Sequence, residues 1–452
     1  MPWLLAASCL FYMAFIPSYI LILLVTILID YFAGIYIERM EGHGRKTLLW
    51  VSILSTCTVL FIFKYYGFFV GSFVSVVQLL GWNLPRPVLS IILPIGLSFH
   101  TFQSLSYVIE VYRGNQRAER NFLVYATYVM FFPQLVAGPI ERPQNLLHQF
   151  RDWHEFSYVN VTAGLKRMAW GFFKKLVVAD RLALYVNDVY TYPRAYNGLQ
   201  LTIATVFFAY QIYCDFSGYS DIAIGAAQVL GFRLMENFRT PYYSLSTSEF
   251  WRRWHISLST WFKDYVYVPL GGSRVRKNRH IFNLLVTFGV SGLWHGANWT
   301  YVIWGLLNGF YLVFGWLTKE WRDRLFALFG LQEDTRIRKV IMLASTVVLT
   351  CFAWIVFRAR NIGDAAYVFT HLGSGWNFHQ IATEQFLLRQ MPVAIASILV
   401  LEIGQLWGRA VSVPNLIQKL PLPARWTLYA SLVMTVVMFG IYKKTQFIYF
   451  QF

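Results

Sequence analysis

The chain has 452 residues, of which 57% are hydrophobic and only 13% are Asp, Glu, Lys or Arg. That charged share is about half the usual value for a soluble domain, so too little charge is present to cover the surface of a soluble protein of this length. The net charge of +17 fits either the Lys/Arg-rich loops of a membrane protein or a surface for a polyanionic donor. The basic residues are scattered between apolar segments and not gathered on one face, which argues against a nucleic-acid partner.

Apolar segments long enough to cross a membrane recur along the whole chain. A crossing helix needs about 20 residues, and several segments are long enough for two helices, so we predict an all-α, polytopic bundle of about 10–12 transmembrane helices. No polar stretch between the segments is long enough for a soluble domain, which predicts one membrane domain over residues 1–452. The segments cover roughly 3–36, 49–80, 88–110, 123–140, 161–180, 199–231, 281–317, 340–357, 391–408 and 426–442.

Prolines interrupt the apolar segments in the middle of the chain. Broken or re-entrant helices are tolerated in a membrane only where protein or a water-filled cavity surrounds them. We therefore expect a catalytic core, about residues 94–310, that encloses a polar path. The interrupting residues are Pro94, Pro133, Pro139, Pro241 and Pro269.

The four cysteines all lie in apolar stretches, without a CxxC pair or a Cys/His pair at metal spacing. We therefore expect neither a disulfide framework nor a metal site. The sequence after Met1 lacks a basic segment and a small-residue cleavage site, so no cleaved signal peptide is expected.

Two carboxylates, Asp215 and Asp221, interrupt an apolar segment six residues apart. Charged side chains are costly there. We expect each to accept hydrogen bonds from neighbouring Ser, Tyr or backbone groups. The alternative is a role in proton transfer or, in a transporter, in binding a coupling ion.

The next informative segment contains Trp251-Arg252-Arg253-Trp254-His255 and ends at Trp261. A continuous helix would place the three tryptophans on one face and the two arginines elsewhere. Paired arginines suit either the phosphates of a donor or lipid headgroups, and both interpretations stay open.

A second histidine, His295, lies in an apolar span between Gly292 and Gly296. We expect these small neighbours to leave room for a substrate beside the imidazole. Spacing alone fits helix packing and catalysis equally well.

The two histidine segments together resemble the paired signature of the membrane-bound O-acyltransferase family. The first reads Trp-Arg-Arg-Trp-His-Ile-Ser-Leu-Ser-Thr-Trp from Trp251, and the second reads Leu-Trp-His-Gly-Ala-Asn from Leu293. The resemblance is strongest to the bacterial branch that O-acetylates extracellular polysaccharides, which includes alginate O-acetyltransferase. Shorter matches lie at residues 93–99, 111–114, 137–140, 171–175 and 215–221.

This resemblance implies a many-helix bundle around a central tunnel that links the two membrane faces. It implies that His295 is the catalytic general base and that His255 is the second active-site residue. Asp215 and Asp221 would be structural or tunnel residues. The candidates for binding donor or substrate are Arg252, Arg253, Trp254, Trp294 and Asn298.

The resemblance also implies a multi-pass protein in the lipid of a bacterial inner (cytoplasmic) membrane, with acetyl-CoA as donor substrate, no bound cofactor and no metal. Acetyl would pass outward to an extracytoplasmic SGNH-type acyltransferase partner, which modifies the polymer. The alternatives are O-acetylation of peptidoglycan, D-alanylation-type transfer, direct acylation of lipid or protein, and a glycan flippase without chemistry.

An aromatic segment, Gln446-Phe-Ile-Tyr449-Phe-Gln-Phe452, closes the sequence. Its aromatic residues could anchor it at the membrane interface. Because similar aromatic tails recur in related transferases, the second hypothesis is that Tyr449 carries acetyl as a phenolic ester.

Overall fold

The computed structural model describes residues 1–85, 94, 96–377, 385–410, 419–442 and 447–448, and within these ranges every regular element is a helix. Six helical segments in these ranges are long and apolar enough to cross a membrane. The predicted all-α, polytopic membrane fold is confirmed, while the number of crossings and the central tunnel stay predictions. The six segments are Tyr19–Arg39, Gly42–Leu79, Trp299–Leu317, Arg336–Arg358, Arg389–Gly408 and Leu422–Phe439.

The chain folds as two compact units. Unit 1 consists of Met1–Leu165 and Ala223–Met235, and unit 2 consists of Lys166–Ile222 and Glu236–Phe452. Two of the three boundaries fall inside helices, in α9 (Tyr158–Phe172) and α11 (Gly198–Val229), and the third lies between Met235 and Glu236 in the non-helical segment after α11. For this reason no composition change along the sequence marks the division.

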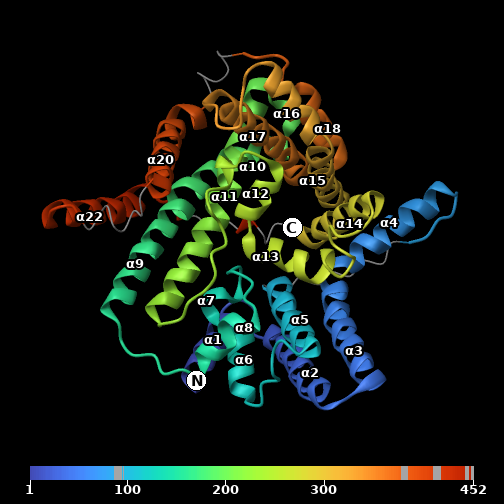
Figure 1. Cartoon of the computed structure of the whole chain (residues 1–452). Helices are drawn as coiled ribbons and strands as arrows, with labels where there is room; N and C mark the ends of the chain where they lie inside the picture. Colours follow the sequence, from blue (N-terminus) through green and yellow to red (C-terminus); the bar gives the residue numbers. More distant parts are fainter. Residues whose placement is uncertain (86–93, 95, 378–384, 411–418, 443–446, 449–452) are drawn as a thin grey trace. The chain divides into compact units, whose positions relative to one another are not determined.

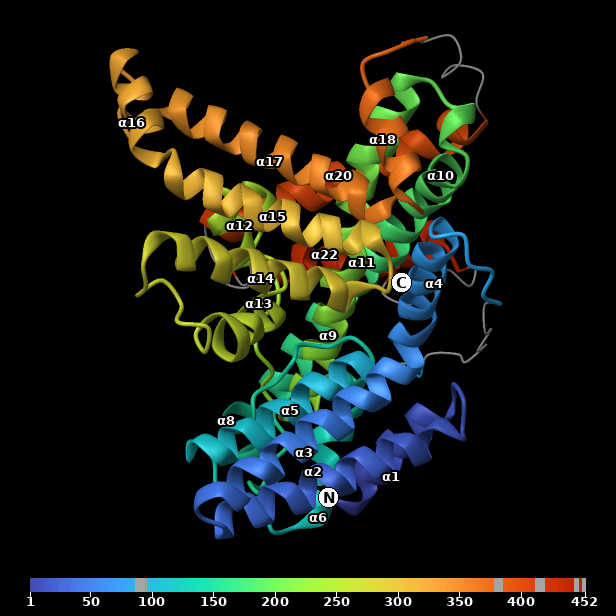
Figure 2. The ribbon, with the colours of Figure 1, turned by 90° about the vertical axis from the view of Figure 1, so that its right-hand side faces the viewer.

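Unit 1 is built around α2, α3 and α5, which pack on one another (Figures 1 and 2). The buried Asp30 of α2 accepts a hydrogen bond of 2.6 Å from Ser52 of α3. A carboxylate in an apolar bundle is costly unless it is hydrogen-bonded, so this bond helps to fix the two helices together. The helices of unit 1 are α1 (Pro2–Met13), α2 (Tyr19–Arg39), α3 (Gly42–Leu60), α4 (Tyr66–Leu79), α5 (Leu97–Arg113), α6 (Phe122–Met130), α7 (Phe132–Leu135) and α8 (Pro143–Leu146).

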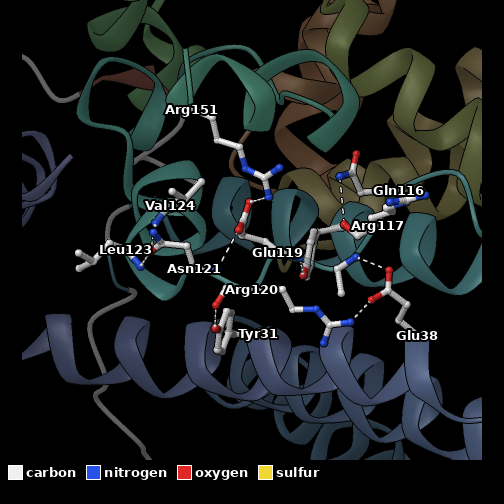
Figure 3. A network of polar contacts seen from close by, with 12 residues as sticks. Tyr31, Glu38, Gln116, Arg117, Glu119, Arg120, Asn121, Leu123, Val124 and Arg151 are labelled. Atoms are coloured by element: carbon white, nitrogen blue, oxygen red, sulfur yellow. Dashed lines mark hydrogen bonds and ion pairs between the residues drawn. The ribbon is translucent and has the colours of Figure 1, made fainter. Parts of the chain in front are cut away.

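A polar network holds the loop that follows α5 (Figure 3). The Tyr31 hydroxyl donates to the Arg120 carbonyl at 2.6 Å, and the Arg120 guanidinium pairs with Glu38. Glu119, which is 1% exposed, pairs with Arg151 at 2.5 Å. These contacts pair the charges of Glu119 and Arg120 within the unit and hold the turn between α5 and α6.

In unit 2, α14 and α15 form a closely packed helical hairpin, with α17 against α15 (Figure 2). Glycines make this approach possible: a Cβ on Gly305 would lie 2.2 Å from the Phe288 carbonyl oxygen. The helices of unit 2 besides α9 and α11 are α10 (Asp180–Thr191), α12 (Thr247–Arg253), α13 (Ile256–Phe262), α14 (Lys277–His295), α15 (Trp299–Leu317), α16 (Lys319–Leu328), α17 (Arg336–Arg358), α18 (Ile362–His371), α20 (Gln385–Ala410) and α22 (Leu422–Phe439).

Candidate active site

His255 stands at a break between α12 and α13, in a left-handed backbone conformation with φ of 41°. Only one other non-glycine residue in the described part of the chain, Thr240, has a positive φ. The continuous helix considered from the sequence is therefore wrong, since the chain turns at His255. Left-handed backbone is rare for non-glycine residues and gathers at functional sites, where surrounding contacts hold it.

Asn237 supplies those contacts. Its carbonyl oxygen accepts a bond of 2.9 Å from the Ile256 N–H, which is one of the first amides of α13. Its Oδ1 accepts from the Ser257 hydroxyl at 2.9 Å and from the Ser257 N–H at 3.3 Å. Asn237 thus caps α13 and fixes the break.

The same amide oxygen selects the tautomer of His255. Asn237 Oδ1 lies 3.1 Å from His255 Nδ1. Because Oδ1 already accepts from a backbone N–H, it can only be an acceptor here, and Nδ1 must carry the proton. The lone pair of neutral His255 is therefore on Nε2, the nitrogen that could accept a proton or a hydrogen bond during the reaction.

His255 is buried, with 1% of its surface exposed, and its ring meets Phe216 edge-on at 4.5 Å. It lies outside the six membrane-length helices. Burial, and to a smaller extent the nearby His295, lower the pKa of His255 well below its ordinary value. His255 is thus neutral at pH 7.

His295 is the last residue of α14 and is 5% exposed. Its ring meets Trp304 of α15 at 5.0 Å and Phe357 of α17 at 5.6 Å, both edge-on. Three helices of unit 2 therefore set the position of this imidazole.

The turn after His295 is fixed by Asn298. Its side chain accepts from the Thr300 N–H at 3.1 Å, which caps α15, and donates to the Arg360 carbonyl at 3.0 Å. Asn298 was predicted to bind donor or substrate, which stays a prediction; in the structure its amide holds the turn after His295.

The glycines beside His295 serve helix packing. A Cβ on Gly292 would lie 2.2 Å from the Tyr301 carbonyl oxygen, and one on Gly296 would lie 2.2 Å from the Tyr301 ring. The expectation that they leave room for a substrate is wrong for the side that faces α15, because Tyr301 fills that space. Their small size lets α15 approach α14 and brings Trp304 against His295.

A wall of tryptophans joins the surroundings of the two histidines. Trp254, next to His255 and 2% exposed, lies 5.0 Å from Trp354, and Trp354 stacks on Trp304 at 5.8 Å. Such a wall excludes water from the site. Trp294, the other predicted tryptophan, is half-buried on α14.

The two arginines before His255 differ in their surroundings. Arg253 pairs with Glu249 one turn earlier at 2.5 Å, whereas Arg252 is exposed. Binding of a donor phosphate by either residue stays a prediction. No cluster of three or more His, Cys, Asp or Glu side chains suited to a metal occurs among the described residues.

Asp215 and Asp221 pair with lysines. Lys175 lies 2.5 Å from Asp215, and Lys174 lies 2.6 Å from Asp221. From the sequence, these carboxylates were expected to accept hydrogen bonds from Ser, Tyr or backbone groups, and the two lysines were not foreseen as partners. In the structure they belong to a π-helical segment, Phe173–Ala179, that continues α9.

Close helix contact explains these pairs. A Cβ on Gly171 would lie 2.7 Å from the Gly218 carbonyl oxygen, so the two backbones nearly touch there. Asp215 and Asp221 flank Gly218 by three residues on each side, which brings both carboxylates to the α9 side of α11. Arg167 adds a bond of 3.0 Å to Asp221.

Asp215 has a second partner far along the chain. Its Oδ2 accepts the Ile448 N–H at 2.8 Å. The Phe447 ring lies 5.3 Å from Tyr219 and 6.1 Å from Phe216, the ring that also contacts His255. The segment is thus held one aromatic ring away from His255, while Tyr449 itself lies outside the described residues.

Sequence reasoning missed Asn237 and Trp304. Both lie in the conspicuous motifs, Asn237 before Arg239-Thr-Pro and Trp304 nine residues after His295. A polar residue four positions before Pro241 is a signal that could have pointed to Asn237, whereas only the fold shows that Trp304 touches His295.

Comparison with known proteins places this geometry in a family. The model of the membrane-bound O-acyltransferase family matches residues 52–362, more than half of the chain, and this range contains both histidines. The chain is 38% identical over 362 residues to the probable alginate O-acetylase AlgI of Pseudomonas aeruginosa, which covers 79% of this chain and 67% of that protein. It is 33% identical over 393 residues to the peptidoglycan O-acetyltransferase of Helicobacter pylori, a match that covers 81% of this chain and 72% of that protein. It is 25% identical over 277 residues to the teichoic acid D-alanyltransferase of Bacillus subtilis, a match that covers 59% of this chain and 69% of that protein. The chain, with two buried histidines in a multi-pass helical fold, therefore belongs to the membrane-bound O-acyltransferase family and is an O-acyltransferase.

Proposed function

We propose that this enzyme takes an acetyl group from cytoplasmic acetyl-CoA and passes it across a bacterial inner membrane for O-acetylation of an extracellular polysaccharide such as alginate. The observation that carries the proposal is the burial of both His255 and His295 against one continuous set of tryptophan rings. The relatives named for alginate and peptidoglycan O-acetylation support acetyl as the acyl group.

In the proposed reaction an acceptor hydroxyl attacks the thioester carbonyl carbon, and His295 takes the hydroxyl proton as general base. The C–S bond then breaks, and the coenzyme A thiolate leaves with a proton returned by His295. His255, neutral and with its lone pair on Nε2, orients the acceptor hydroxyl or assists the proton transfer. The tryptophan wall protects the thioester from hydrolysis by water.

The membrane explains why transfer is needed at all. Coenzyme A is highly charged and cannot cross about 30 Å of hydrocarbon, whereas an acetyl group can pass along a protein-lined path. Arg252 and Arg253 are the candidate contacts for the donor's phosphates. On the outer side an SGNH-type acyltransferase would receive the acetyl group, with Tyr449 as the candidate carrier.

The alternatives use the same site or conflict with it. Peptidoglycan O-acetylation and D-alanylation need the same base and differ in the acyl group or acceptor. A flippase driven by coupling ions would need accessible membrane carboxylates. Asp215 and Asp221 are instead neutralised by Lys175, Lys174 and Arg167.

The test is transfer of labelled acetyl from acetyl-CoA to extracellular polymer in membrane vesicles that contain the partner. His295→Ala should abolish transfer. His280→Ala, on the same helix but packed on Trp316, is the matched control and should retain it. Equal transfer by both variants would remove His295 as the base, and no transfer by the wild type would contradict acetyl-CoA as donor.

A further inference from the structure

Trp304 is a buried hydrogen-bond donor at the catalytic histidine. Its indole is 1% exposed and meets the His295 ring edge-on, with centroids 5.0 Å apart. Within the described residues, its Nε1–H has no hydrogen-bond acceptor. Leaving such a donor unpaired costs about 1–3 kcal/mol, and for this reason buried polar groups are nearly always paired.

The neighbouring Trp354 shows what a structural tryptophan does in the same wall. It stacks on Trp304 at 5.8 Å with an angle of 16° between the rings, and its Nε1 donates to the Tyr242 hydroxyl at 3.1 Å. The two stacked indoles thus differ in one respect. The N–H of Trp354 is hydrogen-bonded, whereas the N–H of Trp304, the indole in contact with His295, has no acceptor among the described residues.

The indole N–H of a second tryptophan, Trp251, is also unpaired within the described part of the chain. Trp251 packs edge-on against Trp304 at 5.7 Å, and its Nε1 also lacks an acceptor among the described residues. An unpaired N–H group such as that of Trp304, on a ring in contact with the catalytic base, is suited to an oxygen atom that becomes negatively charged during the reaction.

From this arrangement we infer that the Trp304 Nε1–H is a catalytic hydrogen-bond donor to the carbonyl oxygen of the donor thioester. The inference rests on the proposed function. When the acceptor oxygen forms its bond to the carbonyl carbon, the C=O π electrons move to the carbonyl oxygen, and the hydroxyl proton goes to His295. Trp304 stabilises that oxyanion until the C–S bond breaks and the electrons return to form C=O.

The fold holds this donor rigidly, as such a role requires. Trp304 and His295 belong to helices whose backbones touch at Gly292 and Gly305, where a Cβ on either residue would lie 2.2 Å from the opposite helix. A dipole fixed in place before the reaction needs no reorganisation when charge develops, and this is the source of its stabilising effect.

The experiment compares Trp304→Phe with Trp354→Phe as a matched control from the same stack. The rate of coenzyme A release is measured at saturating acetyl-CoA. Removing one oxyanion donor lowers kcat on the order of 100-fold, so we expect this loss for Trp304→Phe with little change in KM. Trp354→Phe keeps an aromatic ring in the wall and removes no donor from the oxyanion, so it should lose far less kcat than Trp304→Phe.

The variant that loses more activity, Trp304→Phe, should be the more stable of the two. Trp354→Phe loses a hydrogen bond to Tyr242, whereas Trp304→Phe removes an N–H that has no partner, so Trp304→Phe should unfold at the higher temperature of the two. A structural role of Trp304 would instead lower stability and activity together.

Benzothienylalanine at position 304 removes the N–H and keeps the ring size. It should reproduce the loss of kcat even if the Phe variant fails to fold. Wild-type kcat in the benzothienylalanine protein, or equal loss in both Phe variants, would overturn the inference. A wild type that releases no coenzyme A would contradict the proposed function itself, and the inference with it.

Discussion

The contact between Asp215 and Ile448 can be tested with a change that removes a single donor. Ile448→Pro deletes the N–H that Asp215 Oδ2 accepts at 2.8 Å and leaves the carboxylate in place. A hydrogen bond to a charged group contributes about 1.5–3 kcal/mol. Because Lys175 still pairs with Asp215 at 2.5 Å, the loss should lie near the lower limit, and the docking equilibrium should fall about tenfold.

Docking can be followed by ¹⁹F NMR of a trifluoromethyl-phenylalanine at position 447 in detergent-solubilised protein. The docked ring lies among Tyr219, Phe216 and Lys175, so docked and released states should give separate signals. Ile448→Val keeps the N–H and serves as control. If Ile448→Pro leaves the signal unchanged, the hydrogen bond does not hold the segment, and the reasoning is refuted. Acetyl transfer should fall with the docked fraction.

Three further predictions concern the histidine site. Gly292→Ala should destabilise the protein by more than 1 kcal/mol, because the added Cβ would lie 2.2 Å from a backbone oxygen. Gly71→Ala is the control: the space there is open, and the change should stabilise the helix by about 0.5–1 kcal/mol. Thermal unfolding of the two variants in detergent measures the difference. Asn237→Ala removes the acceptor for His255 Nδ1 and should lower kcat at least tenfold. Asn237→Asp keeps an acceptor and should shift the acidic limb of the pH–rate profile to higher pH. An unchanged profile for both variants would exclude control of the His255 tautomer by Asn237. Because its folded-state pKa is depressed, His255 contributes stability that is present above pH 6.5 and is lost as pH falls, so the wild type should lose about 1.4 kcal/mol between pH 7.5 and 5.5 relative to His255→Asn; parallel pH dependence in the two proteins would contradict this.

The sequence alone determined the class of protein and the identity of its histidines. Low charge and recurrent apolar segments require a membrane, and the lipid then permits only helices or a closed barrel. The motifs around His255 and His295 identified the family, because they form a long, ordered pattern that can be read without the fold.

Tertiary structure decided how these residues act. The break at His255 depends on Asn237, the pairing of Asp215 and Asp221 depends on contact between Gly171 and Gly218, and Ile448 reaches Asp215 across 233 residues of sequence. Hydropathy and spacing report only on neighbours along the chain, whereas each of these contacts joins separate helices. The touching glycine backbones set the register between helices, and this register determined that Trp304 faces His295.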